Sequence, residues 1–242
     1  MSARQRVGPA TLAEDASAAA ADALRLRLAG LLFERPRAAW ADEVRSLAGA
    51  QPDRTLAVAS EAGAAATEGD YLRVFGPGGS VSPREVAYQG FADPGRILAD
   101  LSAFYDAFAF HPRAEDPFDH IAVETGFVGY LAMKEAYALA TGDRQRAAMT
   151  RKARTLFLKT HLRPFVAGLR LRLSGADAPA HLQRTVRFMA GWARCDLLGS
   201  EILAPKGSAE EPALTCGEYG CRETCAEGET KPEWTADPFG RT

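Results

Sequence analysis

Apolar residues recur every three or four positions along most of the chain, and this spacing is typical of amphipathic helices. In the first such stretch, Leu24, Leu28, Leu31 and Leu32 form one face before Pro36 ends the pattern. The strict alternation that indicates strands is not found. Helices are predicted over residues 12–33, 38–48, 53–68, 70–75, 93–110, 118–140, 144–163, 164–173 and 178–198. The pattern therefore predicts an all-α fold, a single globular domain of about eight to ten helices.

Residues 118–140 are predicted to form the central helix, because apolar side chains occur on nearly every face of this stretch. Asp116 is expected to cap the helix, and Asp119 to lie exposed in its first turn, where a carboxylate meets the positive end of the helix dipole. Gly126 and Gly129 lower the helix propensity without adding burial. They predict that a neighbouring backbone passes close to this helix.

Two patterns that often carry chemistry are incomplete in this chain. The loop GPGGSVSP (76–83) is rich in glycine but lacks the G-x-x-x-x-G-K-[ST] spacing of a phosphate cradle. His120 and Glu124 have the i, i+4 reach of a metal-binding pair, but there is no H-E-x-x-H motif and no third ligand nearby. The chain is therefore not expected to be an enzyme.

The amino-acid composition limits the possible functional classes of the protein and the cellular compartments in which it could act. The formal net charge of the 242 residues is −2, so there is no basic excess of the kind that nucleic-acid binders show. Only Cys195 of the four cysteines lies in the helical part, which gives no disulfide framework and favours a reducing compartment. We expect no signal peptide and no membrane span, because acidic residues interrupt every apolar run. A cytoplasmic location is predicted.

The chain changes character near residue 204. Residues 204–242 contain four prolines, five glycines, eight acidic and four basic residues, and show little apolar periodicity. We therefore divide the chain into a helical domain (1–203) and an acidic, flexible tail (204–242). The tail holds Cys216, Cys221 and Cys225, whose x4 and x3 gaps differ from the C-x2-C pairs of common zinc sites. Free thiols and a metal or iron-sulfur site remain alternative interpretations.

Three segments resemble the TorD/DmsD family of cytoplasmic chaperones. YLRVFGPGGSVSPREVAY (71–88) is similar to the family's aromatic-L-F-G loop ending in P-x-E-S-V-Y. DPFDHIAVETGFVGYL (116–131) is similar to its P-D-H-[IL]-x-x-E-L-x-F-M helix, and FLKTHLRPF (157–165) to its F-L-x-x-H-L-x-P-W segment. The sequence departs from the family pattern at Arg84, where relatives often have Trp or Tyr, and at Thr125 and Val128.

The resemblance implies a TorD-like helical fold and a function in the maturation of molybdenum-cofactor oxidoreductases. Such chaperones bind the twin-arginine leader of an apo catalytic subunit, hold the subunit until its cofactor is inserted, and thereby delay export. The resemblance also implies weak binding of a guanine nucleotide, and a monomer or a dimer formed by helix exchange. A metal or iron-sulfur accessory protein that acts through the tail cysteines is the alternative function.

A leader consists of a basic pair followed by an apolar helix, so its receptor needs carboxylates beside an apolar groove. The residues expected to bind the leader or the client are Tyr71, Phe75, Glu85, Tyr88, Asp116, Asp119, His120 and Glu124. Structural roles are the alternative for several of them. Asp119 would only start the helix, His120 would be a core histidine bonded to Glu124, and Glu85 and Tyr88 would anchor the loop. His161 is interpreted as structural.

Overall fold

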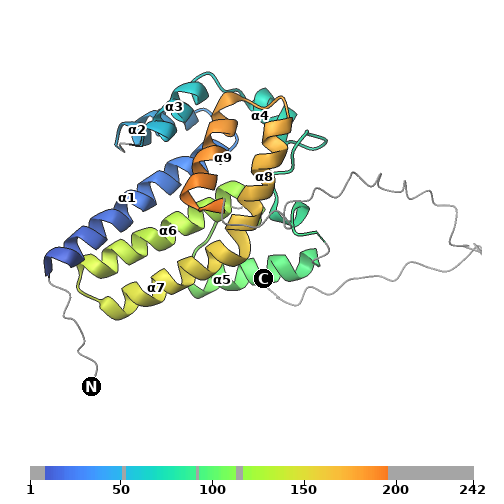
Figure 1. Ribbon diagram of the computed structural model, residues 1–242. Helices are drawn as coiled ribbons and strands as arrows, with labels where there is room; N and C mark the ends of the chain where they lie inside the picture. The colour runs from blue at the N-terminus through green and yellow to red at the C-terminus, as the bar shows by residue number, and fades with distance from the viewer. Residues whose placement is uncertain (1–8, 51–52, 91–92, 113–116, 196–242) are drawn as a thin grey trace, which may run out of the picture. The chain divides into compact units, whose positions relative to one another are not determined.

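The computed structural model describes residues 9–50, 53–90, 93–112 and 117–195 (Figure 1). The α-helices in these ranges are α1 (Pro9–Phe33), α2 (Trp40–Gly49), α3 (Arg54–Gly63), α4 (Glu68–Phe75), α5 (Pro94–Ala107), α6 (Ile121–Ala140), α7 (Arg144–Phe157), α8 (Arg163–Gly175) and α9 (Ala180–Trp192). A 3-10 turn, η1 (Glu85–Ala87), follows α4, and a π-helical turn, η2 (Leu158–Leu162), joins α7 to α8. The predicted all-α fold is confirmed: these ranges hold nine α-helices, and their only β-type pairing is one isolated bridge.

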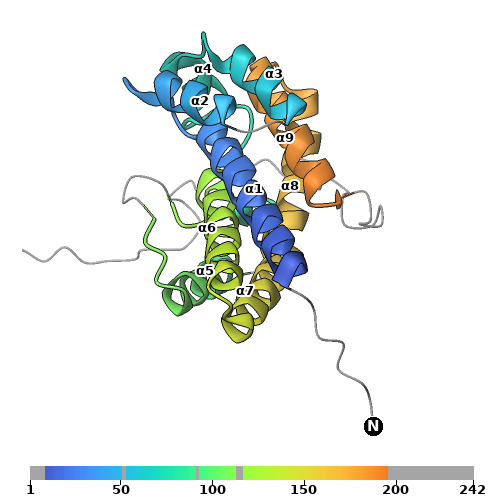
Figure 2. The same cartoon turned by 90° about the vertical axis from the view of Figure 1, so that its left-hand side faces the viewer.

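Helix α6 is the central helix, as its sequence predicts. It runs along α1 on one side and contacts α7 on another (Figures 1 and 2). Fourteen of its 20 residues are buried, among them the fully enclosed Phe127 and Leu131. The close approach predicted from its glycines is found at Gly129, where an added Cβ would lie 3.2 Å from Leu26 Cβ of α1. Because the helix is apolar all round, it needs neighbours on most of its surface.

The predicted start of this helix is wrong. The first residue of α6 is Ile121, and the N-cap is His120, whose Nδ1 accepts a hydrogen bond from the backbone N–H of Ala122. Asp116 lies outside the described residues. A local motif of Asp, Pro and Asp usually starts a helix, but here residues 117–119 form a turn that leads the chain to a neighbouring loop.

Aromatic rings join α5, α6 and α7. Phe104 and Tyr105 of α5 meet Phe127 of α6 and Phe157 of α7, with ring centroids 4.8 to 6.5 Å apart. The ring of Phe157 also lies 5.0 Å from that of His161 in η2. Edge-to-face contacts of this kind stabilise a core beyond the area they bury. They fix α5 against the turn η2, and both elements contribute to the walls of a groove.

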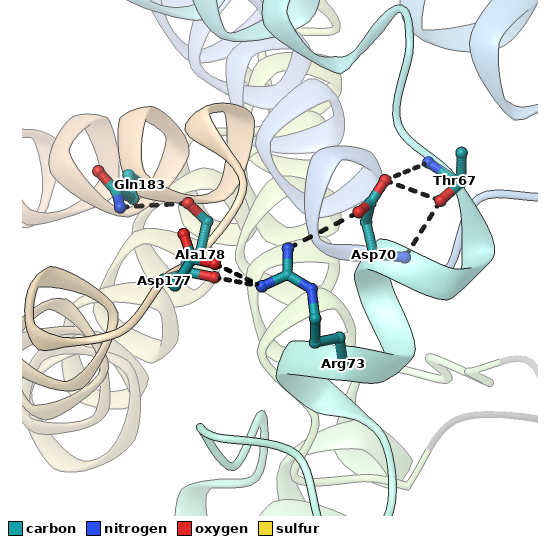
Figure 3. A network of polar contacts seen from close by, with 6 residues as sticks. All are labelled: Thr67, Asp70, Arg73, Asp177, Ala178 and Gln183. Carbon is teal, nitrogen blue, oxygen red and sulfur yellow. Dashed lines mark hydrogen bonds and ion pairs between the residues drawn. The ribbon is translucent and has the colours of Figure 1, made fainter.

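A polar contact joins α4 to the connection between α8 and α9 (Figure 3). Thr67 and Asp70 form a capping box at the start of α4. Arg73 of the same helix lies 3.7 Å from Asp70 and donates to the backbone O and a carboxylate oxygen of Asp177, at 2.7 and 3.0 Å. The loop that follows α4 therefore starts from a helix held at both ends.

None of the helices in the described ranges is both long and apolar enough to cross a membrane.

Candidate functional site

The loop after α4 and the chain before α6 are joined by backbone hydrogen bonds. Glu85 N donates to Asp119 O at 2.8 Å, and Ile121 N donates to Pro83 O at 2.9 Å, so that Arg84 and His120 form an antiparallel bridge. Glycines make the preceding turn possible: a Cβ on Gly79 would lie 2.5 Å from Val74 O. The loop and the helix start, which the sequence places about 35 residues apart, therefore form one structural unit.

Asp119 is fully buried, and the prediction that it is exposed is therefore wrong. Its Oδ1 accepts a hydrogen bond from Nε of Arg84 at 2.9 Å, and its Oδ2 accepts one from the backbone N of Val86 at 3.4 Å. The Arg84 side chain is 42% exposed, so the ion pair reaches from the interior to the surface. Buried carboxylates need such partners, because an uncompensated charge is costly away from water.

His120 is also buried, and it is hydrogen-bonded to Tyr71 instead of Glu124. Its Nδ1 accepts the capping hydrogen bond at the start of α6, so Nε2 carries the proton and donates to the Tyr71 hydroxyl at 3.0 Å. The rings of Tyr71 and Phe75 meet edge to face, with centroids 5.5 Å apart. The ring of Phe75 also meets that of His120 edge to face, with centroids 6.5 Å apart. These contacts join α4 to the start of α6.

Glu85 is the centre of a second set of buried polar contacts. Nδ1 of His161 lies 3.2 Å from both carboxylate oxygens of Glu85, and the side-chain amide of Gln89 donates to one of them. His161 belongs to η2, so this contact joins the loop to the turn between α7 and α8. Tyr88 lies beside this set: its hydroxyl donates to Ser82 O at 2.7 Å.

Glu124 is fully buried next to this set, and neither of its carboxylate oxygens has a hydrogen bond of standard geometry among the described residues. Burial raises the pKa of Glu124 well above its usual value, and the charge and close contact of Glu85 and the charge of Asp119 raise it further. Burial and the neighbouring carboxylates therefore favour the neutral form of this carboxyl group. Burial also raises the pKa of Tyr105, whose hydroxyl donates to Phe118 O at 2.8 Å.

A groove of about 790 Å³ lies between α5 and the segment formed by α7 and η2. Its apolar wall is formed by side chains that include Ile97, Phe104, Phe108 and Leu156. Other side chains that line it are polar or charged: Gln89, Asp93, Arg96, Asp100, Thr160 and His161. Because Gln89 and His161 both contact Glu85, the groove lies next to the partners of this buried carboxylate.

The predicted site residues thus fall into two groups. Seven of them, from Tyr71 to Glu124, lie in one region that connects α4, the loop and α6, whereas Asp116 lies outside the described residues. Cys216, Cys221 and Cys225 lie outside them too. In the part of the chain that is described, no cluster of three or more His, Cys, Asp or Glu side chains is suited to a metal ion.

Sequence reasoning missed three residues of this region: Arg84, Gln89 and Tyr105. Arg84 stands out in the sequence only as a departure from the family pattern, and its distance of 35 residues from Asp119 hides the ion pair. The sequence predicts a structural role for His161, and the structure shows that its ring contacts the carboxylate of Glu85. Gln89 follows Glu85 by four residues, a spacing that carries no signal outside a long helix.

Comparison with known proteins gives a family. No curated protein and no solved structure shows a significant match to the chain. The family model described as nitrate reductase delta subunit matches residues 34–170, which is more than half of the chain. The match covers α2 to α7, both short turns and the Glu85, Asp119 and His161 positions.

The members of this family are chaperones that assist the maturation of molybdoenzymes. The chaperones themselves are not catalysts. The predicted family and the predicted lack of enzymatic activity are therefore confirmed by this match, and a molybdoenzyme subunit is the partner that the family implies. The chain belongs to the nitrate reductase delta subunit family, the family of TorD-like chaperones.

Proposed function

We propose that this protein binds the twin-arginine leader and the apo form of a molybdoenzyme catalytic subunit. It holds the subunit in the cytoplasm until the molybdenum cofactor is inserted, and so delays export. The observation that carries this proposal is the position of the groove. Its apolar wall lies beside the exposed carboxylates of Asp93 and Asp100, which is the combination that a basic pair followed by an apolar helix requires.

The groove supplies a surface for each part of a leader. Ile97, Phe104 and Leu156 suit the apolar helix, because apolar side chains in a groove are the usual anchors for an amphipathic or apolar helix. Asp93, the N-cap of α5, and Asp100 of the same helix are exposed in the lining of the groove, where a cation can approach them from solvent. Gln89 and His161 bring the groove to Glu85.

The buried residues of the site support this surface from within. Tyr71, Phe75 and His120 fix α4 against the start of α6, and Tyr88 fixes the loop. Glu85 and Glu124 are enclosed in the fold as it stands, so their contribution to leader binding passes through the residues that cover them. Asp119 differs, because its ion-pair partner, Arg84, is 42% exposed.

The test is a titration of a fluorescent twin-arginine leader with Leu156→Glu and Leu171→Glu variants. Leu156 lies in the groove and is 49% exposed, whereas Leu171 lies on α8 and is 48% exposed, so the two changes add the same charge at equal exposure. Neither change is expected to unfold the protein, since substitutions at such positions alter stability little.

We expect Leu156→Glu to weaken leader binding at least tenfold, about 1.4 kcal/mol, because a carboxylate would be placed against the apolar helix of the leader. Leu171→Glu should bind as the parent protein does. Equal affinities for the two variants would mean that the groove is not the docking surface. Failure of the parent protein to bind any twin-arginine leader would remove the proposed function itself.

A further inference from the structure

The ion pair between Arg84 and Asp119 has an unusual arrangement, since a fully buried carboxylate is covered by a half-exposed arginine. Only Nε of the guanidinium contacts the carboxylate, at 2.9 Å. Among the described residues, Arg84 is the only basic side chain within ion-pair distance of Asp119. The 42% exposed Arg84 side chain therefore connects the buried carboxylate of Asp119 to the surface.

The backbone does not depend on this side chain. The bridge between the loop and α6 is held by Glu85 N on Asp119 O and by Ile121 N on Pro83 O, at 2.8 and 2.9 Å. Rotation of the Arg84 side chain toward solvent leaves both hydrogen bonds in place. It would uncover Asp119 without unfolding the loop.

The surroundings of Asp119 favour a cation in the place of Arg84. Glu124 is buried close to Asp119, its carboxylate oxygens have no hydrogen bond of standard geometry, and Glu85 is already bonded to His161 and Gln89. Among the described residues, the Asp119 carboxylate accepts hydrogen bonds only from Arg84 and from the backbone N of Val86, so it loses its one charged partner if Arg84 leaves. An unpaired buried carboxylate is strongly destabilising, so removal of one guanidinium favours entry of another.

We infer that Asp119 is a guanidinium-binding site that Arg84 fills in the free protein, and that an arginine of the client's leader displaces Arg84 when the client binds. This inference rests on the proposed function and adds its regulation. Arg84 is an internal competitor, and leader binding at this point is an exchange of one arginine for another. The exchange favours arginine over lysine, because a guanidinium presents a planar set of donors that an ammonium cannot copy.

The inference predicts that removal of the competitor strengthens binding. Arg84→Met keeps an apolar stem but leaves Asp119 free, and we expect it to bind a fluorescent twin-arginine leader at least tenfold more tightly than the parent protein does. Arg172→Met is the matched control. Arg172 is an exposed arginine of α8 without an ion pair to Asp119. Its charge acts on Tyr88, which belongs to the same loop as Arg84. This control should change the affinity by less than about threefold, the general effect of removing one surface charge.

A second measurement uses the unaltered protein, since Arg84→Met leaves a buried carboxylate unpaired and could lower stability. The ¹⁵Nε resonance of Arg84, identified by its loss in Arg84→Lys, should shift when the twin-arginine leader is added. It should stay in place when the two leader arginines are replaced by alanines.

The outcomes separate the two proposals. If the parent protein binds the leader but Arg84→Met does not bind more tightly than Arg172→Met, or the Nε resonance does not move, Arg84 is only a structural partner of Asp119 and the inference is overturned. Leader binding through the groove would stand in that case. If the parent protein does not bind the leader, the proposed function and this inference both fail.

Discussion

His181 is a buried histidine on α9, 3% exposed, whose ring meets that of Trp40 at a centroid distance of 6.0 Å. Burial lowers the pKa of His181 to about 4, and the charge of Asp70 opposes this shift. The side chain is therefore neutral in the folded protein over most of the acidic range. It joins α2 to α9 as an apolar ring would.

This pKa predicts a loss of stability in mild acid. Below the ordinary value of 6.5 the unfolded chain takes up a proton at His181, whereas the folded protein does so only near pH 4. The contribution of this residue is thus complete above 6.5 and is lost as the pH falls toward 4. Between pH 7 and pH 5 the free energy of unfolding should drop by about 2 kcal/mol on this account.

Denaturant unfolding of the parent protein at both pH values measures the drop. His181→Phe keeps a ring against Trp40 and removes the titration, so it should reduce the difference between pH 7 and pH 5. His111 is exposed, and His111→Gln should keep the slope of the parent protein. A His181→Phe variant with an unchanged slope would contradict the assignment.

At the scale of single residues, the sequence identifies the polar residues of the site but does not predict that they are buried. It singled out Glu85, Asp119, His120 and Glu124, and the fold brings all four into one region. It did not indicate that they are buried, because the residues that cover them come from elsewhere in the chain. Arg84 covers Asp119 from a position 35 residues earlier, and His161 meets Glu85 from 76 residues later. Such long-range partners leave no local pattern.

At the scale of elements, the two glycines of α6 have different surroundings. An added Cβ at Gly126 would have no atom within 4 Å, whereas one at Gly129 would lie 3.2 Å from Leu26 Cβ and 3.4 Å from Ala23 O. The contact that Gly126 allows comes from the other helix, because Gly30 of α1 packs close to its backbone. The absence of a side chain at Gly129 therefore allows the close approach of α1. At Gly126 there is room for a side chain.

We predict opposite effects of alanine at these two positions. Gly126→Ala should raise the free energy of unfolding by up to about 1 kcal/mol, because alanine has the higher helix propensity. Gly129→Ala should lower it by about 1 to 3 kcal/mol, since the added methyl group pushes against the backbone of α1. Urea unfolding of both variants gives the comparison within one helix. Equal stabilisation by both changes would show that α1 and α6 separate at little cost, contrary to the packing described.

Element boundaries followed local signals only where these signals had no competitor. The Asp93 cap with Pro94 starts α5 as predicted, because that motif is free to act. The similar motif before α6 does not start the helix, since residues 119–121 pair with the loop instead. The predicted split at Pro164 is found as the π-helical turn η2 followed by α8, with the proline in the first turn, where its missing N–H costs nothing.

At the scale of the whole molecule, periodicity was sufficient for the fold class because helices form most of the described chain. The order of the helices and the central place of α6 also follow from the sequence, since a helix that is apolar on every face must be enclosed. The groove does not follow from it. Its walls come from α5 and from α7 with η2. The apolar periodicity of these helices does not predict that a space lies between them.

Residues 204–242 are rich in proline, glycine and acidic residues and lack apolar periodicity, so we propose that this segment is a flexible tail that adds little to the stability of the helical domain. Removal of residues 206–242 should leave the helical circular dichroism signal and the thermal midpoint almost unchanged, because little apolar area would be lost.

The same truncation distinguishes the two interpretations of Cys216, Cys221 and Cys225. If these cysteines are free thiols, the full-length and truncated proteins should contain equal amounts of metal after purification and should unfold at the same temperature. Since a metal that binds only the folded state adds its binding free energy to stability, a structural metal site would be visible in both measurements at once. Loss of a bound metal together with a fall of many degrees in the midpoint would show that the tail belongs to the fold, and would contradict the division at residue 204.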